Sequence, residues 1–242
     1  MKHRPIREKG EGVKRSEVNR VVAAAASRFR SQGIPLPEFA DWRPEDWLRR
    51  TESVSTLMAA GLGWDVVEWP PGPFETSGLL LFTLRNVTRT DPSGCVDGYA
   101  EKLMLIRPEQ RTPLHTHRRK MEDLINRGGG RLVIELVAAE TASESLSVIL
   151  NGTAVEIGRL NGIVELCPGD SVTLVPGVYH SFYARDRDVV AGEVSTYNDD
   201  AHDNVFVDPI ERFPAYVEDE PPQRLVVADY PRILGTSSFG NA

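Results

Sequence analysis

Three of the five histidines in the chain fall in two short segments, and a carboxylate lies close to them in sequence. His115 and His117 are two residues apart, Glu122 follows five residues later, and His180 ends a Pro-Gly-Val-Tyr-His segment at 176–180. On an extended strand, side chains two positions apart point to the same side, and a short turn can bring Glu122 back beside them. The sequence therefore predicts that these four side chains converge on one point.

Imidazole and carboxylate groups together suit a divalent Mn, Fe, Co, Ni or Zn ion. Four such ligands leave two positions of an octahedral ion open, so we expect one metal per chain with a catalytic role. The alternative is a basic surface loop, because Arg118, Arg119 and Lys120 directly follow the first two histidines. The recurrence of His180 beside the Pro176-Gly177 turn favours the metal site.

The length and composition of the chain limit the classes of protein to which it can belong. The chain has 242 residues, 40% hydrophobic and 26% charged, which is enough for one sizeable core, and we expect a single domain over residues 1–242. A net charge of -7 argues against a nucleic-acid partner. No apolar run approaches the roughly 18 residues of a membrane span, and the basic N-terminus lacks the apolar core of a secretion signal. We therefore expect a cytoplasmic protein without a membrane partner, in which Cys95 and Cys167 form no disulfide framework.

Helical periodicity is confined to the first quarter of the chain. Residues 16–33 have the spacing of an amphipathic helix with Ser16 as its N-cap, and a second helix is expected from near Pro44 towards Gly61. Together they predict an N-terminal helical element over residues 16–62. Five aromatic residues are expected to anchor this element outside the core, with stacking on a sugar as the alternative; they are Phe39, Trp42, Trp47, Trp64 and Trp69.

From Gly78 the pattern changes to short apolar runs bounded by turn residues. The predicted strands are 79–85, 99–107, 131–137, 146–150, 154–157, 163–166, 171–175, 181–184 and 189–195. No gap between them is long enough for a helix, so the pattern predicts an antiparallel β-barrel or sandwich core over residues 78–200. Asn151-Gly152 predicts a two-residue hairpin. The run Arg127 to Gly130 precedes a strand rather than a helix, which favours a tight turn over a phosphate-binding loop, and we predict no nucleotide cofactor.

The two histidine segments resemble the paired metal-binding motifs of the cupin superfamily. The resemblance rests on His115-x-His117, Glu122 and the later segment that ends in His180. It implies a jelly-roll barrel in which these four residues bind one divalent metal. Cupins carry a glycine six residues before the first histidine and an asparagine four residues after the last, whereas this chain carries Glu109 and Ala184, at what we interpret as turn and packing positions.

Several longer blocks resemble the D-lyxose isomerase family. They are residues 61–65, 81–86, 99–102, 122–130 and 197–204, within a similarity that runs from about residue 15 to about residue 232. The resemblance implies a metal-dependent aldose–ketose isomerase, with manganese as the usual ion. It would interconvert D-lyxose and D-xylulose, and also D-mannose and D-fructose, through a cis-enediolate. The family and the exposed edges of a jelly roll also imply a homodimer.

Isomerisation also requires an acid/base group that is not bound to the metal. Lys102 is a candidate, because on an alternating strand it shares a face with Met104 and Ile106 while Leu103 and Leu105 occupy the other. A lysine inside a barrel needs a partner or a task. The alternative is a lysine at the strand edge whose ammonium group reaches water.

The matching carboxylate is less clear from the residues alone. Glu211 lies in an acidic loop, where surface exposure is the simpler interpretation, but the family resemblance favours Glu211 with Lys102 as the acid/base pair. Glu193 lies in an apolar run and is an alternative base or a sugar contact. Lys120, Asp200 and His202 are predicted sugar contacts. The acidic neighbourhood of His202 favours a solvated loop or a subunit contact over a role as a fifth metal ligand.

One function of a different kind stays open. Cupins also include iron-dependent dioxygenases and sugar-binding regulatory modules without turnover. A regulator is disfavoured because no helix-turn-helix segment or basic patch accompanies the barrel. An oxygenase is disfavoured because a lysine and additional carboxylates are more useful in proton transfer than in oxygen chemistry.

Overall fold

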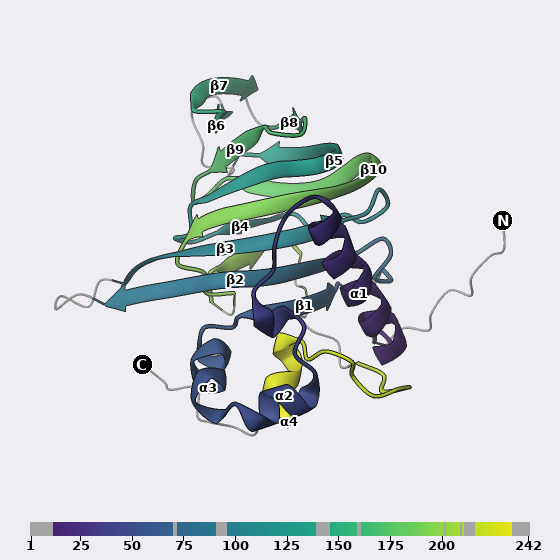
Figure 1. Ribbon diagram of the computed structural model, residues 1–242. Coiled ribbons are helices and arrows are strands. Elements are labelled where there is room, and N and C mark those ends of the chain that lie inside the picture. The colour runs from purple at the N-terminus through teal and green to yellow at the C-terminus, as the bar shows by residue number, and fades with distance from the viewer. Residues whose placement is uncertain are drawn as a thin grey trace, which may run out of the picture.

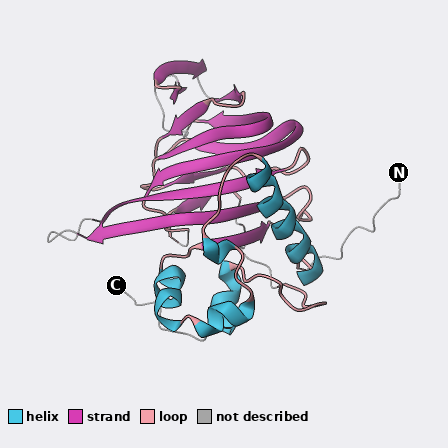
Figure 2. Ribbon diagram, in the orientation of Figure 1, coloured by secondary structure: helices cyan, strands magenta, loops and turns pink. Residues whose placement is uncertain are grey.

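The computed structural model describes residues 12–69, 72–90, 96–138, 146–158, 161–200, 202–208, 210 and 216–233. Its helices are α1 (Arg15–Ser31), η1 (Glu38–Ala40), α2 (Pro44–Arg49), α3 (Thr51–Ala59), η2 (Val227–Asp229) and α4 (Tyr230–Ile233), where η marks a 3-10 helix. Its strands are β1 (Gly63–Glu68), β2 (Gly78–Thr90), β3 (Val96–Ile106), β4 (His115–His117), β5 (Glu122–Val137), β6 (Leu146–Leu150), β7 (Thr153–Gly158), β8 (Asn161–Leu166), β9 (Ser171–Leu174), β10 (Tyr179–Thr196) and β11 (Asn204–Phe206). Helices therefore flank a continuous series of strands at both ends of the described chain (Figure 2).

The strands form one antiparallel sheet in the order β1-β2-β3-β10-β5-β9-β6-β7. β8 pairs with β5, β4 pairs with β10, and β11 pairs with β4. In Figure 1 the long strands β2, β3, β10 and β5 lie side by side across the middle of the molecule. Side chains from β1, β2, β3, β5, β6, β8, β9 and β10 meet in one interior apolar cluster, which is the arrangement of a jelly roll. The prediction of a mainly β, cupin-type antiparallel barrel with N-terminal helices packed outside is confirmed.

Alternation along the central strands separates two apolar cores. On β3, Met104 and Ile106 belong to the interior cluster, whereas Leu103 and Leu105 belong to a second cluster beneath α1. α1 lies across the outer face of the sheet (Figure 1), and its Phe29 is fully buried there. Each large side chain buried in this way stabilises the fold by roughly 1.5–3 kcal/mol. The helix therefore closes the outer face and leaves the barrel interior for the site.

The predicted aromatic anchors divide between the two sides of the sheet. Phe39, Trp42, Trp47 and Trp64 pack in the clusters beneath and beside the helices, as predicted. Trp69 instead belongs to the interior cluster, so its predicted place outside the barrel is wrong. It continues the alternation of β1, in which Val67 already points inward.

The helical element differs in two details from the prediction. Lys14 is the N-cap of α1, while Ser16 hydrogen-bonds with both its backbone N–H and its hydroxyl to Asp219. The second predicted helix is two helices, α2 and α3, which Arg50 separates with a non-helical backbone (φ -111°, ψ 55°). No helix among the described residues is long and apolar enough to cross a membrane.

Two predicted strands, 181–184 and 189–195, are parts of the single strand β10. The ladder between β10 and β5 contains register shifts between Arg185 and Val189 and between Val190 and Ala191. Asp186 lies within the first shift and has a left-handed backbone (φ 72°). Residues 185–188 are polar and resemble a turn in sequence, but they form a bulge within the strand and do not end it.

The glycine run after Arg127 lies inside β5, so the predicted turn is wrong. Gly129 has φ 110°, and a Cβ atom there would collide with the carbonyl oxygen of Asp188. A Cβ atom on Gly130 would collide with the carbonyl oxygen of Arg185. The glycines therefore make room for the bulge of β10. The hairpin predicted at Asn151-Gly152 is confirmed between β6 and β7, with φ 48° and 80°.

Candidate metal centre and the ionic network beside it

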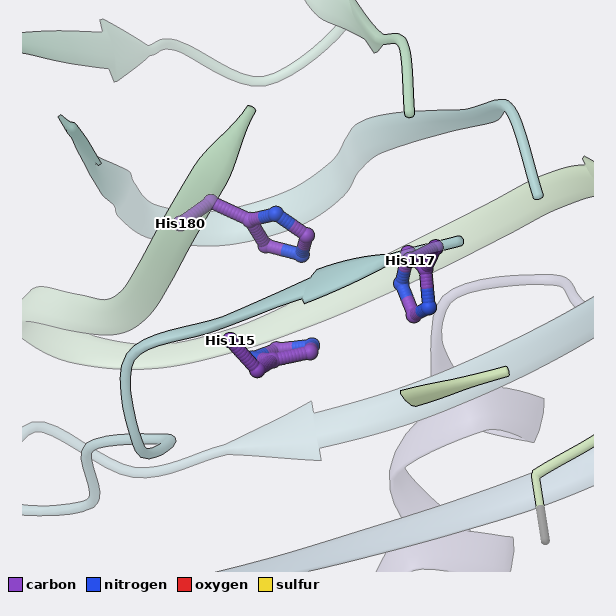
Figure 3. A group of neighbouring side chains, drawn as sticks. All are labelled: His115, His117 and His180. Atoms are coloured by element: carbon purple, nitrogen blue, oxygen red, sulfur yellow. The ribbon is translucent and has the colours of Figure 1, made fainter. Parts of the chain in front are cut away.

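The three histidines lie at the junction of β4 and β10. His115 and His117 begin and end the three-residue strand β4, so both point to the same side. His180 pairs directly with His115 in the ladder between β10 and β4. One ring nitrogen from each histidine lies within 4.8 Å of one from the others, and Figure 3 shows the three rings directed into a common space. Among the described residues, the predicted histidine cluster is therefore formed.

Glu122 completes the cluster from the first position of β5. Its Oε1 atom lies 3.0 Å from Nε2 of His180 and 3.3 Å from Nε2 of His117. Nδ1 of His115 contacts the carbonyl oxygen of Pro113 at 2.8 Å, and Nδ1 of His180 contacts that of Val178 at 3.2 Å. A protonated Nδ1 would donate these two bonds and leave the Nε2 lone pairs directed at the shared space.

The cluster fits a divalent metal ion. Although Nε2 of His180 is 3.0 Å from Glu122, it lacks the alignment of a hydrogen bond, and no described residue provides it with another partner. An unpaired buried nitrogen is destabilising unless a ligand engages it. Three imidazoles and one carboxylate are also a donor set that such ions prefer.

The electrostatics of the cluster agree with this fit. Burial lowers the pKa of His115 well below its ordinary value, and His180 and His117 add to the effect. Burial alone would raise the pKa of Glu122, but the charge of Lys120 and the close approach of His117 and His180 lower it well below its ordinary value. A neutral imidazole and an ionised carboxylate are the forms that bind metal.

A buried network of lysines and carboxylates adjoins the histidines. Nζ of Lys120 lies 2.6 Å from Oε2 of Glu122 and 2.8 Å from Oε1 of Glu193. Nζ of Lys102 lies 3.2 Å from the same Glu193 oxygen and 3.7 Å from Oδ1 of Asp200. Glu122 thus presents one oxygen to the histidines and the other to Lys120, which holds the carboxylate in the orientation of a ligand.

The charges of this network support one another. Burial alone would lower the pKa of Lys120, but Glu122, Glu193 and Asp200 raise it well above its ordinary value. Burial alone would raise the pKa of Glu193, but Lys102 and Lys120 lower it. Lys120, Glu122 and Glu193 are therefore ionised together, and each compensates for the burial of the others.

Seven of the predicted site residues line one pocket. Lys102, Lys120, Glu193 and Asp200 line it with His115, His117 and Glu122. His180 is fully buried and is not among the lining residues. The apolar part of the wall includes Val67, Trp69, Leu81, Met104, Phe182 and Phe206. The pocket thus combines a polar end that holds the ligand set with an apolar wall, as small-molecule sites do.

Two further predictions concern the loops. Glu211 lies outside the described residues. His202 is 80% exposed and pairs with Asp199, which agrees with a solvated loop rather than a fifth metal ligand.

Sequence reasoning missed two polar residues of the site, Asn198 and Asp203. Asn198 accepts a hydrogen bond from Lys102, and Asp203 accepts the backbone N–H groups of Arg119 and Lys120. Asp203 thereby fixes the turn that joins β4 to β5. Both lie in the polar run directly after β10, and a buried strand that leads into such a run was the signal for them.

The fold and this interior cluster define a class: a cupin-type barrel that carries the ligand set of a divalent metal site. Two solved structures share the fold. The L-ribose isomerase of Acinetobacter sp. DL28, in complex with L-ribose, matches with a TM-score of 0.54 at 21% identity, covering 83% of this chain and 94% of that chain. The L-ribose isomerase of Geodermatophilus obscurus matches with a TM-score of 0.53 at 20% identity over the same shares.

Sequence comparison gives the family. The family model for D-lyxose isomerase matches residues 13–230. The D-lyxose/D-mannose isomerase of Escherichia coli O157:H7 is 40% identical over 225 residues, which cover 90% of this chain and 98% of the relative. That of Serratia proteamaculans is 40% identical over 231 residues, which cover 92% and 100%. The chain belongs to the D-lyxose isomerase family, as its sequence motifs predicted.

Proposed function

We propose that this aldose–ketose isomerase interconverts D-lyxose and D-xylulose, and also D-mannose and D-fructose, through a cis-enediol(ate). The observation that carries the proposal is the contact between the histidine–Glu122 cluster and the lysine–carboxylate network within one pocket. The two relatives at 40% identity carry both aldoses in their names. D-lyxose and D-mannose share the configuration at the reacting carbons, so one site serves both.

We further propose that His115, His117, Glu122 and His180 hold one divalent ion, with Mn²⁺ as the expected metal and Co²⁺, Fe²⁺, Ni²⁺ or Zn²⁺ as alternatives. When bound, the ion would polarise the substrate carbonyl as a Lewis acid and offset the charge of the enediolate. Lys120 keeps Glu122 ionised and oriented for this role.

The proton transfers are assigned to Lys102 and Glu211. A base removes the proton from C2 of the aldose while O1 gains a proton, which gives the enediol. O2 then loses its proton and C1 is protonated, which gives the ketose. Lys102, buried at the pocket wall, is suited to exchange protons with the sugar oxygens. Glu211 is assigned to the carbon proton from the family resemblance, with Glu193 as the alternative base.

Other parts of the pocket would bind the sugar. Lys120, Glu193 and Asp200 present charged groups at its polar end, where they would contact hydroxyl groups. The apolar wall would accept the carbon side of the chain. We also propose, from length and composition, that residues 1–242 form a single cupin-fold domain and that the protein is cytoplasmic. From the family resemblance and the exposed edges of a jelly roll, we propose that it is a homodimer.

Metal dependence and substrate are tested together. Metal-stripped protein is incubated with D-lyxose under anaerobic conditions, Mn²⁺ is then added, and D-xylulose is measured by chromatography. We expect product only after the metal is added, and the same order of events with D-mannose and D-fructose. Product that requires oxygen, or no product from any pentose or hexose with any of the five ions, would contradict the proposal.

The catalytic roles are tested by variants loaded with Mn²⁺. Lys102→Ala and Glu211→Gln are each expected to bind the metal as the parent does and to lose at least about 100-fold in kcat, the size of a general acid/base contribution. If Glu211→Gln keeps the full rate and Glu193→Gln does not, the base is Glu193. If Lys102→Ala keeps the full rate, the assignment of Lys102 is wrong.

A further inference from the structure

Asn198 connects the two buried lysines. Its Oδ1 atom accepts a hydrogen bond from Nζ of Lys102 at 2.7 Å and a longer one from Nζ of Lys120 at 3.5 Å. The residue follows the end of β10 in a segment without regular secondary structure, yet it is only 8% exposed. A buried amide in a loop is retained where its hydrogen bonds fix the position of something else.

The backbone of Asn198 is held by the side chain of Asn86 on β2. The amide nitrogen of Asn86 donates to the carbonyl oxygen of Asn198 at 3.0 Å, and its amide oxygen accepts the N–H of Asn198 at 3.2 Å. The same nitrogen donates to the carbonyl oxygen of Ala60, the C-cap of α3, at 3.3 Å. The loop after β10 is thereby tied to both the sheet and the helical element.

An irregularity in β2 turns Asn86 towards Asn198. The ladder with β3 pairs Thr83 with Lys102 and Asn86 with Ala100, with a register shift between Thr83 and Arg85. Three residues of β2 therefore span the same length as two residues of β3. As a result, the side chains of β2 that face inward lie at odd positions before the shift and at even positions after it. Without the extra residue, Asn86 would face the other side of the sheet.

We propose that Asn198, clamped by Asn86, is a positioning residue that fixes the Nζ atom of Lys102 for proton exchange with the substrate. The proposal rests on the role assigned to Lys102 under the proposed function. Lysine has a long flexible stem, so a single acceptor leaves its ammonium group free to swing. Glu193 is shared between both lysines, and Asn198 supplies Lys102 with a second acceptor from a separate element.

The choice of an amide has an electrostatic reason. The network already contains the carboxylates of Glu122, Glu193 and Asp200 around two lysines. Asn198 adds a strong acceptor without adding a further buried negative charge, which would be costly here. Position is therefore fixed while the charge balance of the pocket is left unchanged.

The test compares Asn198→Ala with the parent, both loaded with Mn²⁺, using D-lyxose as substrate. We expect kcat to fall by about 10–100-fold, because a small misplacement of a catalytic group has effects of this size. KM and the affinity for Mn²⁺, measured by calorimetry, are expected to change by less than about three-fold, because Asn198 is not assigned a substrate or metal contact. Asn198→Asp keeps an acceptor oxygen and is expected to recover part of the lost kcat, with a lower melting temperature because of the added buried charge.

Asn126→Ala is the matched control. Asn126 is also a fully buried asparagine, but its amide donates only to the backbone oxygens of Gly130 and Leu166, away from the pocket. Its loss is expected to lower the melting temperature and leave kcat per folded molecule unchanged. If Asn198→Ala behaves in the same way, Asn198 is structural and the proposal is wrong.

Two further variants keep the outcomes distinct. Asn86→Ala leaves Asn198 itself in place and is expected to lower kcat by a smaller factor. This variant also tests the proposal if Asn198→Ala does not fold.

On a Lys102→Ala background, Asn198→Ala is expected to lower the residual rate by less than about two-fold, because the effects of groups that act as a unit are not additive. A full additional loss there would overturn the positioning role. Full activity of Lys102→Ala would instead overturn the role assigned to Lys102 under the proposed function. An inactive Lys102→Ala beside an unimpaired Asn198→Ala would overturn only this inference.

Discussion

Two buried ionic clusters lie on opposite sides of the sheet, and they differ in whether their hydrogen bonds are complete. Beneath α1, Arg15 makes four hydrogen bonds to the carboxylates of Glu218 and Asp229, at 2.6–3.0 Å. Its guanidinium group also stacks over the ring of Tyr216, 4.8 Å from the centroid. The two carboxylates face the guanidinium group, so residues of the chain itself complete the hydrogen bonds of this cluster.

The cluster in the barrel is not saturated. Its lysines and glutamates satisfy one another, but no described residue gives Nε2 of His180 or Nδ1 of His117 a hydrogen bond. A saturated cluster holds elements together, whereas one with unpaired buried donors and acceptors is arranged for a ligand. The comparison therefore predicts that changes on the helical side affect stability and that changes in the barrel affect metal binding and turnover.

The largest effect is expected from His180→Ala. It removes a proposed metal ligand, so bound metal should fall from about one ion per chain to a small fraction, and turnover by at least about 1000-fold. The metal-free variant should melt somewhat below the metal-free parent, because the substitution leaves a cavity and removes the contact of Nδ1 with the carbonyl oxygen of Val178. Metal analysis and kcat measure the first effect, and calorimetry of the stripped proteins measures the second. His202→Ala, which removes an exposed histidine, is the control and should retain both metal and rate.

Arg15→Met should have the converse effect. It leaves Asp229, whose side chain is 2% exposed, without its principal partner, and the loss of one partner of a buried pair costs about 3–5 kcal/mol. Urea unfolding should show this loss while kcat per folded molecule stays unchanged. Arg20→Met removes an exposed pair with Glu17 and should change stability by less than about 0.5 kcal/mol. A large fall in kcat for the folded Arg15 variant would contradict the prediction that the cluster on the helical side affects stability alone.

Lys120→Met tests the connection between metal site and network. Without its amine, Glu122 loses the group that orients its second oxygen, and the affinity for Mn²⁺ should fall by about 10–100-fold. Titration calorimetry of stripped protein measures the change. Arg119→Met removes a neighbouring positive charge whose side chain is 74% exposed, and it should bind the metal as the parent does. Equal losses in both variants would indicate a general effect of charge instead of orientation.

The smallest effect concerns pH. Hydrogen bonds from Arg15 lower the pKa of Glu218 below its ordinary value of 4.5. A lowered folded-state pKa contributes stability that is present above the unfolded value and is lost as pH falls through the folded value. Because Glu218 is 38% exposed, the contribution should be below about 1 kcal/mol. The stability difference between parent and Glu218→Gln should therefore shrink between about pH 5.5 and pH 3.5 in urea titrations; a difference that grows in this range would give the opposite sign.

Local spacing was enough to predict much of the site. His115 and His117 are two apart on a strand, and that rule depends only on the pleat. The inward direction of Lys102 followed from the same alternation and is confirmed by its burial with Met104 on the barrel side. The cupin-type barrel followed from the series of short apolar runs. These features share one property: each depends on residues close together in sequence.

What sequence reasoning missed depends on strand irregularities. Asn86 and Asn198 meet only because β2 gains a residue relative to β3. The glycines at 128–130 were interpreted as a turn because their real cause, the carbonyl groups of the β10 bulge, lies more than fifty residues away. Trp69 was placed outside because its strand, β1, was not predicted. Pairing between distant strands cannot be obtained from the period of one segment.

The number of residues in the bulge of β10 determines which side chains of that strand face the site. His180 and Phe182 point into the barrel from even positions, whereas Ala191 and Glu193 point into it from odd positions of the same strand. The change occurs within residues 185–188, between the inward-facing Ala184 and Val189, and this segment holds no ligand and no member of the lysine network. An insertion or deletion of one residue there would require either the metal ligand or the partner of Lys102 to face outward, whereas a change of two would preserve both directions. Engineers who vary this surface segment should therefore treat its length, odd or even, as a catalytic property.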